Sequence, residues 1–87
     1  MTRPRLVTGA RLRYDEVRAE HQMLVPEGVV RLNATAAEVL ELCDGERSLD
    51  EIVSALSERY GGGDLRGDVV GLVEGLAQRG LVVDAAV

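Results

Sequence analysis

Apolar and polar residues alternate in the first third of the chain, with the period of two that is typical of β-strands. Leu12 and Tyr14 stand between charged neighbours, which predicts a half-buried strand. A short apolar run, Gln22 to Val25, is separated from Val29 to Leu32 by a Pro-Glu-Gly tripeptide. Proline presets the second position of a turn and glycine is favoured at the fourth. The pattern therefore predicts a strand followed by an antiparallel hairpin that turns at Val25 to Gly28.

Three amphipathic helices are predicted in the rest of the chain, because apolar residues there recur every three or four positions. The first helix follows a capping box formed by Thr35 and Glu38, with Asn33 as a competing cap. We expect it to end at Asp44-Gly45, since glycine readily adopts the left-handed conformation at a helix C-terminus. Its apolar face consists of Ala36, Val39, Leu42 and Cys43.

The second and third helices have their own boundary signals. Ser48 and Glu51 form a capping box, and three successive glycines end the second helix. Asp64 is the expected cap of the third helix, and Gly80 is expected to close it. The second helix buries a stripe of Leu49, Ile52, Val53, Leu56 and Tyr60, and the third a stripe of Leu65, Val69, Leu72, Val73 and Leu76.

These elements predict one α+β domain that spans residues 1–87. Its outline is winged helix-turn-helix-like: a small antiparallel three-stranded sheet, three helices, and a short C-terminal strand at Leu81 to Val83. Met1 to Arg5 is polar and contains a proline, so we expect this end to be disordered.

Composition narrows the functional classes. The formal net charge is −5, which disfavours contact with nucleic acid phosphates and anionic membrane surfaces. Phe and Trp are absent, and Tyr14 and Tyr60 are the only aromatic residues that could stack on bases. Cys43 has no partner for an internal disulfide, which is typical of a reducing compartment. No apolar run indicates a signal peptide or a membrane span, so we expect a cytoplasmic protein.

No catalytic constellation is evident. His21 and Cys43 lack the second His or Cys that a metal site would need, and the neighbours of Cys43 are Leu42 and Asp44 rather than a base. We interpret Cys43 as an inert core thiol and His21 as a surface strand residue. The glycine run before Asp64 lacks the Lys-Ser or Lys-Thr of a phosphate-binding loop. We therefore expect no enzyme activity, no cofactor and no metal.

Two features remain unexplained by folding alone. Gly67, Gly71 and Gly75 recur on one flank of the third helix, where each interior glycine costs about 1 kcal/mol relative to alanine. This flank either admits another backbone closely or reflects the glycine-rich composition. The strand at Val29 to Leu32 either offers a free edge to an added strand or is covered by another strand or a second copy of the chain.

Several motifs resemble the PqqD family of pyrroloquinoline quinone (PQQ) biosynthesis. They are the run Leu24-Val25-Pro26-Glu27-Gly28-Val29-Val30-Arg31-Leu32-Asn33, the run Leu42-Cys43-Asp44-Gly45, and Ser48 to Ile52. Pro4 to Leu6 and Arg11 to Asp15 also resemble the family, and Asp68 to Leu81 matches more loosely, mainly in its apolar positions, so the resemblance covers nearly the whole chain.

The resemblance implies a peptide chaperone without cofactor or metal, either free-standing or fused to another pathway enzyme. Members of the family bind the precursor peptide PqqA as an added strand and present it to PqqE, a radical S-adenosylmethionine enzyme. In this sequence, the implied peptide-binding residues are Val29, Val30, Arg31, Leu32, Asp68, Leu72, Gly75, Leu76 and Arg79. The oligomeric state stays open between monomer and homodimer.

Two other functions compete with the peptide chaperone. In a winged-helix DNA-binding transcriptional regulator, the third helix would be the recognition helix. That helix region carries Arg66 and Arg79 but also Asp64, Asp68 and Glu74, whereas a nucleic acid footprint should be basic. A small enzyme is supported only by scattered carboxylates.

Overall fold

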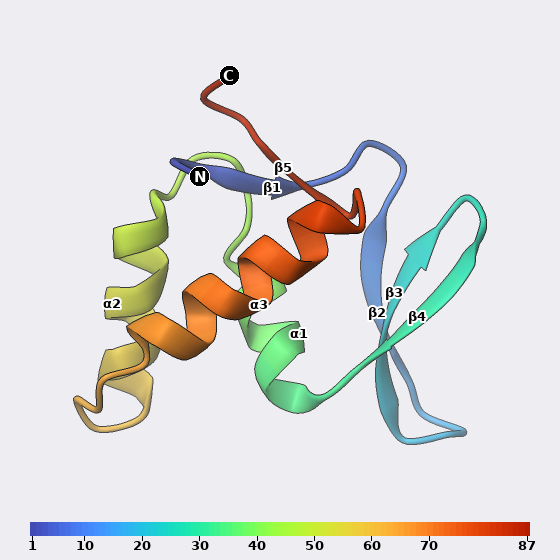
Figure 1. The fold of residues 1–87 in the computed structure, drawn as a ribbon. Helices are drawn as coiled ribbons and strands as arrows, with labels where there is room; N and C mark the ends of the chain where they lie inside the picture. The colour runs from blue at the N-terminus through green and yellow to red at the C-terminus, as the bar shows by residue number, and fades with distance from the viewer.

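The computed structural model describes residues 1–87, which form five strands and three helices (Figure 1). In chain order, the elements are β1 (Pro4–Leu6), β2 (Arg11–Asp15), β3 (Glu20–Val25), β4 (Gly28–Leu32), α1 (Ala34–Glu41), α2 (Leu49–Arg59), α3 (Arg66–Gln78) and β5 (Val82–Asp84). The three helices lie together on one side, and the sheet of β2, β3 and β4 extends from them. The α+β class and the winged outline are confirmed.

The three-stranded sheet has the order β2-β3-β4, with both pairs antiparallel. Val25 pairs with Gly28, so the turn predicted from the Pro-Glu-Gly tripeptide is confirmed. The preceding turn between β2 and β3 is fixed by Asp15, whose Oδ1 accepts the backbone N–H groups of Val17 at 3.0 Å and Arg18 at 3.3 Å. In the same turn, Ala19 has a φ of 54°, a left-handed conformation that few non-glycine residues adopt.

The N-terminal segment is ordered, so the disorder predicted for Met1 to Arg5 is wrong. β1 pairs antiparallel with β5, and Pro4 is fully buried. Asp84 accepts the backbone N–H groups of Thr2 at 2.8 Å and Arg3 at 3.0 Å. The partner strand lies about eighty positions away, and such a long-range pairing has no local sequence signal.

The carboxylate of Asp84 is expected to make the pairing of β1 with β5 sensitive to acid. The N–H groups of Thr2, Arg3 and Ala86 lower its pKa to about 2. A group with a depressed folded-state pKa adds stability above its unfolded value, about 3.9 for Asp, and loses it as the pH falls through the folded value. We expect Asp84→Ala to lower the melting temperature at pH 7, and the gap from the unaltered chain to close between about pH 5 and pH 2. Thermal unfolding across that range tests this, and a constant gap would contradict it.

The helix ends agree with the sequence signals in part. The Ser48–Glu51 capping box of α2 is confirmed, and Gly80 follows α3 at a φ of 76°. Asn33 caps α1 by accepting the N–H of Ala36 at 2.7 Å, so the Thr35–Glu38 box is wrong.

The cap position of α3 lies one residue after the predicted cap, Asp64. Leu65 occupies the cap position without a side-chain bond, and Asp64 accepts the N–H of Arg66 at 3.3 Å from just outside. The carboxylate of Asp64 therefore satisfies a free N–H group of the helix end without being its cap.

The core is aliphatic and lies between the helices and the inner face of the sheet. It contains Met23, Val39, Leu40, Leu42, Cys43, Ile52, Val53, Leu56, Val69, Val73, Leu76, Leu81 and Val82. Both tyrosines stay outside it: Tyr14 is 51% exposed and Tyr60 is 50% exposed. The prediction that Tyr60 belongs to the buried stripe of the second helix is therefore wrong, because Tyr60 occupies the C-cap position of α2, past the part of the helix that packs into the core.

Candidate functional site

β4 is one of the two edge strands of the sheet, with β2 at the opposite edge, and only its side towards β3 is paired. Antiparallel pairs alternate between hydrogen-bonded and non-hydrogen-bonded positions. Since Val25 and Gly28 pair across a two-residue turn, Val29 and Arg31 occupy the non-bonded positions. Their N–H and C=O groups therefore point away from β3, towards solvent. This edge has the backbone geometry that an added strand requires.

An apolar hollow of about 270 Å³ opens where the start of α1, the end of α2 and the first half of α3 meet. Thr35, at its rim, follows the last residue of β4 by three positions. The hollow is lined by Thr35, Val39, Leu56, Tyr60, Leu65, Asp68, Val69 and Leu72. The open strand edge thus leads towards a concave apolar surface.

A polar cluster holds the rim of this hollow in place. The Tyr60 hydroxyl donates to Oε1 of Glu38 at 2.5 Å, and Arg59 donates to Oε2 of the same carboxylate at 3.4 Å. The hydrogen bond to Glu38 also raises the pKa of Tyr60. Glu38 therefore fastens the end of α2 to α1, and the Tyr60 ring forms one wall of the hollow.

The structure places the sequence-predicted peptide residues in four groups. Val29 and Arg31 lie on the outer side of β4, and Val30 and Leu32 are half-buried on its inner side, against the core. Asp68 and Leu72 line the apolar hollow. Gly75 and Arg79 are exposed further along α3. Leu76 is only 5% exposed and belongs to the core, so it offers no free surface.

Sequence reasoning missed the α1 and α2 walls of the hollow. The apolar period predicts Leu65 and Val69 on the stripe of the third helix, but no sequence signal places Thr35 and Tyr60 beside them. α1 contacts the strands of the sheet and also α3, so it stands between the two parts of the predicted site. The surface is therefore built from β4, α1, α2 and α3 rather than from one strand and one helix.

The glycine flank of α3 is open. A Cβ added at Gly67, Gly71 or Gly75 would meet no atom within 4 Å. No other segment of this chain uses the close approach that these glycines permit.

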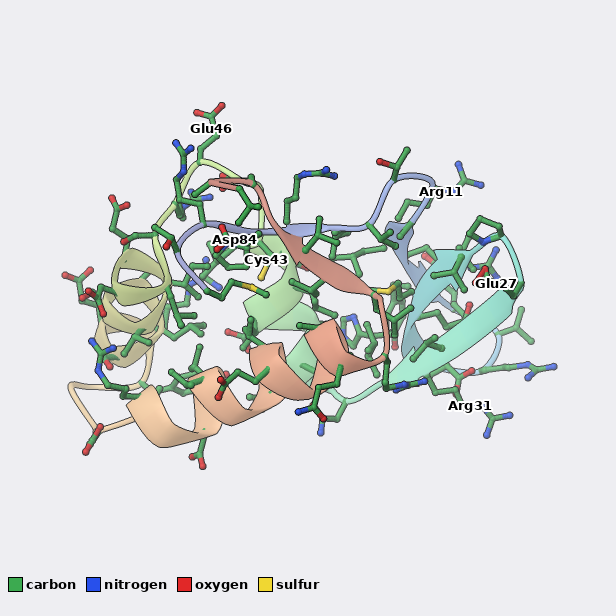
Figure 2. The ribbon with its side chains drawn as sticks, turned by 45° about the horizontal axis from the view of Figure 1, so that its top comes forward. Arg11, Glu27, Arg31, Cys43, Glu46 and Asp84 are labelled. Carbon is green, nitrogen blue, oxygen red and sulfur yellow. The ribbon has the colours of Figure 1, made fainter.

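Cys43 and His21 have the structural surroundings of non-reactive residues. The Cys43 thiol is 4% exposed and donates to the carbonyl oxygen of Val39 at 3.3 Å. Burial raises its pKa to about 12. Figure 2 shows Cys43 inside the molecule, beneath β1 and β5. His21 stacks edge-on against Tyr14, with ring centroids 4.8 Å apart.

We expect Cys43→Ser to destabilise the fold by about 1–3 kcal/mol, because a hydroxyl is costlier than a thiol to bury in an apolar core. Chemical denaturation measures this change. In the unaltered protein, the thiol should react with iodoacetamide only upon unfolding. Rapid alkylation of the native protein would contradict the buried assignment.

None of the helices combines the length and the apolar character needed to cross a membrane. The structure also contains no group of three or more His, Cys, Asp or Glu residues placed to hold a metal ion.

A protein family and two known proteins that this chain resembles are named for PQQ synthesis or for PqqA binding. Residues 20–82 match the family described as Coenzyme PQQ synthesis protein D (PqqD). A "PqqA binding protein" of Rhodopseudomonas palustris strain TIE-1 is 38% identical over 86 residues, covering 97% of this chain and 84% of that protein. The "Bifunctional coenzyme PQQ synthesis protein C/D" of Methylorubrum extorquens is 38% identical over 78 residues, covering 87% of this chain and 21% of that larger protein.

A solved structure shares the fold. It is the solution structure of the PqqD truncation of Methylobacterium extorquens PqqCD, described as a functional and stand-alone recognition element for ribosomally synthesized and post-translationally modified peptides. It superposes with a TM-score of 0.78 at 36% identity, over 92% of this chain and 87% of the other. With the family match spanning most of the fold and relatives this similar over nearly the full length, the chain belongs to the PqqD family.

Proposed function

We propose that this chain binds the precursor peptide PqqA as a strand added to β4 and presents it to the radical S-adenosylmethionine enzyme PqqE. The observation that carries the proposal is the outward edge at Val29 and Arg31, which leads to the apolar hollow beside α3. Backbone hydrogen bonds along β4 fix the register of the peptide, and apolar peptide side chains enter the hollow. The Rhodopseudomonas palustris relative at 38% identity carries the name PqqA binding protein, which supports the choice of peptide.

The role of the chain in this proposal is positioning. Holding a reactant in one geometry accelerates a partner's chemistry without any reacting group on the carrier. The groups with shifted pKa values support a positioning role, because each shift has a structural cause. Asp84, Asp15 and Asp44 accept backbone N–H groups, Tyr60 donates to Glu38, and Cys43 is buried.

Titration of isotope-labelled protein with synthetic PqqA, followed by NMR, tests the binding mode. We expect chemical shift changes concentrated on Val29 to Leu32 and on the residues that line the hollow. A scrambled PqqA sequence of the same composition is the control. No change at saturating peptide concentration would reject the proposal, and changes confined to the outside of α2 would reject the strand-addition mode.

The DNA-binding alternative gains no support from α3. Arg66, which a recognition helix would use, forms an ion pair with Asp50 at 2.7 Å. Asp68 and Glu74 add negative charge to the same helix.

A further inference from the structure

One face of the three-stranded sheet turns away from the helices and carries an ordered polar cluster. Alternate residues of each strand point to this side: Arg13 of β2, Gln22 of β3 and Arg31 of β4 stand opposite one another across the sheet. We call this surface the outer sheet face; it comprises Arg11, Arg13, Asp15, Arg18, Glu20, Gln22, Leu24, Val29 and Arg31. Most of these residues line a shallow hollow of about 370 Å³. The peptide-binding proposal uses only its β4 margin.

Gln22 is the centre of this face and is only 4% exposed. Its Oε1 accepts from Nε of Arg13 at 3.1 Å, and its Nε2 donates to Oε1 of Glu20 at 2.8 Å and to Oδ2 of Asp15 at 3.4 Å. A covered amide with every polar atom engaged holds its charged neighbours in fixed positions.

The carboxylates of this cluster are largely covered, whereas its guanidinium groups are exposed to solvent. The side chains of Asp15 and Glu20 are 13% and 23% exposed. Those of Arg13, Arg18 and Arg31 are 53%, 63% and 74% exposed. Asp15 lies 3.6 Å from Arg13 and 4.0 Å from Arg18, and Glu20 lies 3.7 Å from Arg31. A partner that approaches this face therefore contacts exposed arginines whose positions are fixed by ion pairs with less exposed carboxylates. Guanidinium groups bind the carboxylates of a partner in a bidentate geometry.

Charge is distributed unevenly along the chain. Residues 11–32, which form the three-stranded sheet, contain four arginines and four carboxylates, a net charge of zero, whereas residues 33–87 contain four arginines and eleven carboxylates, a net charge of −7. On the outer sheet face itself, four arginines stand beside only two carboxylates, Asp15 and Glu20. Figure 2 places Arg11 and Arg31 at the sheet end of the molecule, where Glu27 of the β3–β4 turn also lies, and Glu46 and Asp84 away from it. An acidic partner surface is thus attracted to the outer sheet face and repelled by the helices.

We propose that the outer sheet face is the docking surface for an acidic patch on the peptide-modifying enzyme. This inference rests on the proposed function and adds to it where the enzyme binds. A peptide strand added to β4 extends the same sheet, so every second peptide residue joins the outer face beside Val29 and Arg31. An enzyme seated on this face contacts carrier and peptide together, while the opposite peptide side chains stay in the apolar hollow.

The test compares two doubly neutralised variants that change the net charge equally. Arg13→Gln with Arg18→Gln alters the outer sheet face, whereas Arg3→Gln with Arg5→Gln, called the β1 variant, alters β1 and the residue before it, where neither arginine forms an ion pair. The affinity of each for purified PqqE from the same organism is measured by calorimetry with PqqA present, at low and at physiological salt. PqqA binding and the melting temperature are measured separately, and the single Arg18→Gln variant serves if the double variant unfolds.

We expect the sheet variant to bind PqqE about tenfold more weakly or worse, with PqqA binding unchanged and with a weaker salt dependence. The β1 variant should retain the wild-type affinity. Unaltered PqqE affinity in the sheet variant would overturn the inference, and so would an equal loss in both variants, which would indicate net charge alone.

Two further outcomes separate this inference from the proposed function. If the unaltered chain binds PqqA but not PqqE, the docking surface is wrong and peptide binding stands. Retention on duplex DNA that disappears in the sheet variant would make this face a nucleic acid surface and overturn the inference. Loss of PqqA binding by the unaltered chain would instead reject the proposed function.

Discussion

Arg31→Pro is expected to reduce PqqA binding by about tenfold or more while leaving the domain folded. The Arg31 N–H points away from β3, so proline removes no bond within the sheet, and edge strands tolerate proline. The same N–H would donate to the added peptide strand. Its loss removes a hydrogen bond worth about 1 kcal/mol, and the proline ring also obstructs the approach of the peptide. Fluorescence anisotropy with labelled PqqA measures the affinity, and circular dichroism confirms the fold.

Arg31→Ala is the matched control, because it removes the guanidinium group and keeps the backbone donor. Its side chain is 74% exposed and paired only with Glu20 at 3.7 Å, so the fold should be unaffected. We expect a smaller loss of affinity in this variant than in Arg31→Pro. Equal losses would assign the effect to the side chain, and wild-type binding by Arg31→Pro would show that the peptide is not added along β4.

Leu76→Ala is expected to cost about 2–5 kcal/mol of folding free energy, the usual range for truncating a buried leucine. Leu76 lies in the core with 5% exposure. Domains are stable by only about 5–15 kcal/mol, so the variant would lose much of its margin. Urea denaturation at 25 °C measures the change. Weak peptide binding by this variant would reflect unfolding rather than a lost contact.

Gly75→Ala is the adjacent control on the same helix. A Cβ there meets no atom within 4 Å, and alanine is favoured over glycine in a helix by up to about 1 kcal/mol. We expect this variant to be at least as stable as the unaltered chain. A Leu76→Ala protein of normal stability that failed to bind peptide would restore Leu76 to the binding surface.

Features encoded by a few adjacent residues were predictable from the sequence. The Pro-Glu-Gly turn, the Ser48–Glu51 capping box and the glycine after α3 depend on local dihedral preferences and short-range hydrogen bonds. The three helical stripes follow from the period of the apolar positions. Resemblance to a family, rather than these patterns, supplied the function and the expected ligand.

Choices between near-equivalent local signals were decided by tertiary contacts. Asn33 and Thr35 are both acceptable caps; Asn33 caps α1, and the Glu38 carboxylate that a Thr35 box requires bonds instead to Arg59 and Tyr60 at the end of α2. Leu72 and Leu76 look alike on one helical stripe, yet Leu72 lines the hollow and Leu76 lies in the core. A period of 3.6 residues identifies a face but not which part of it another element covers.

The sequence by itself therefore determined the hairpin, the three helices and the C-terminal strand, their order, and most of the apolar face of each helix, but not β1. The tertiary structure decided what those faces meet: the β1–β5 closure, the apolar hollow shared by α1, α2 and α3, and the arginine-rich outer sheet face around Gln22. The reason is physical. Turns and caps are set by interactions within about four residues, whereas these surfaces join residues that are far apart along the chain and near only after folding.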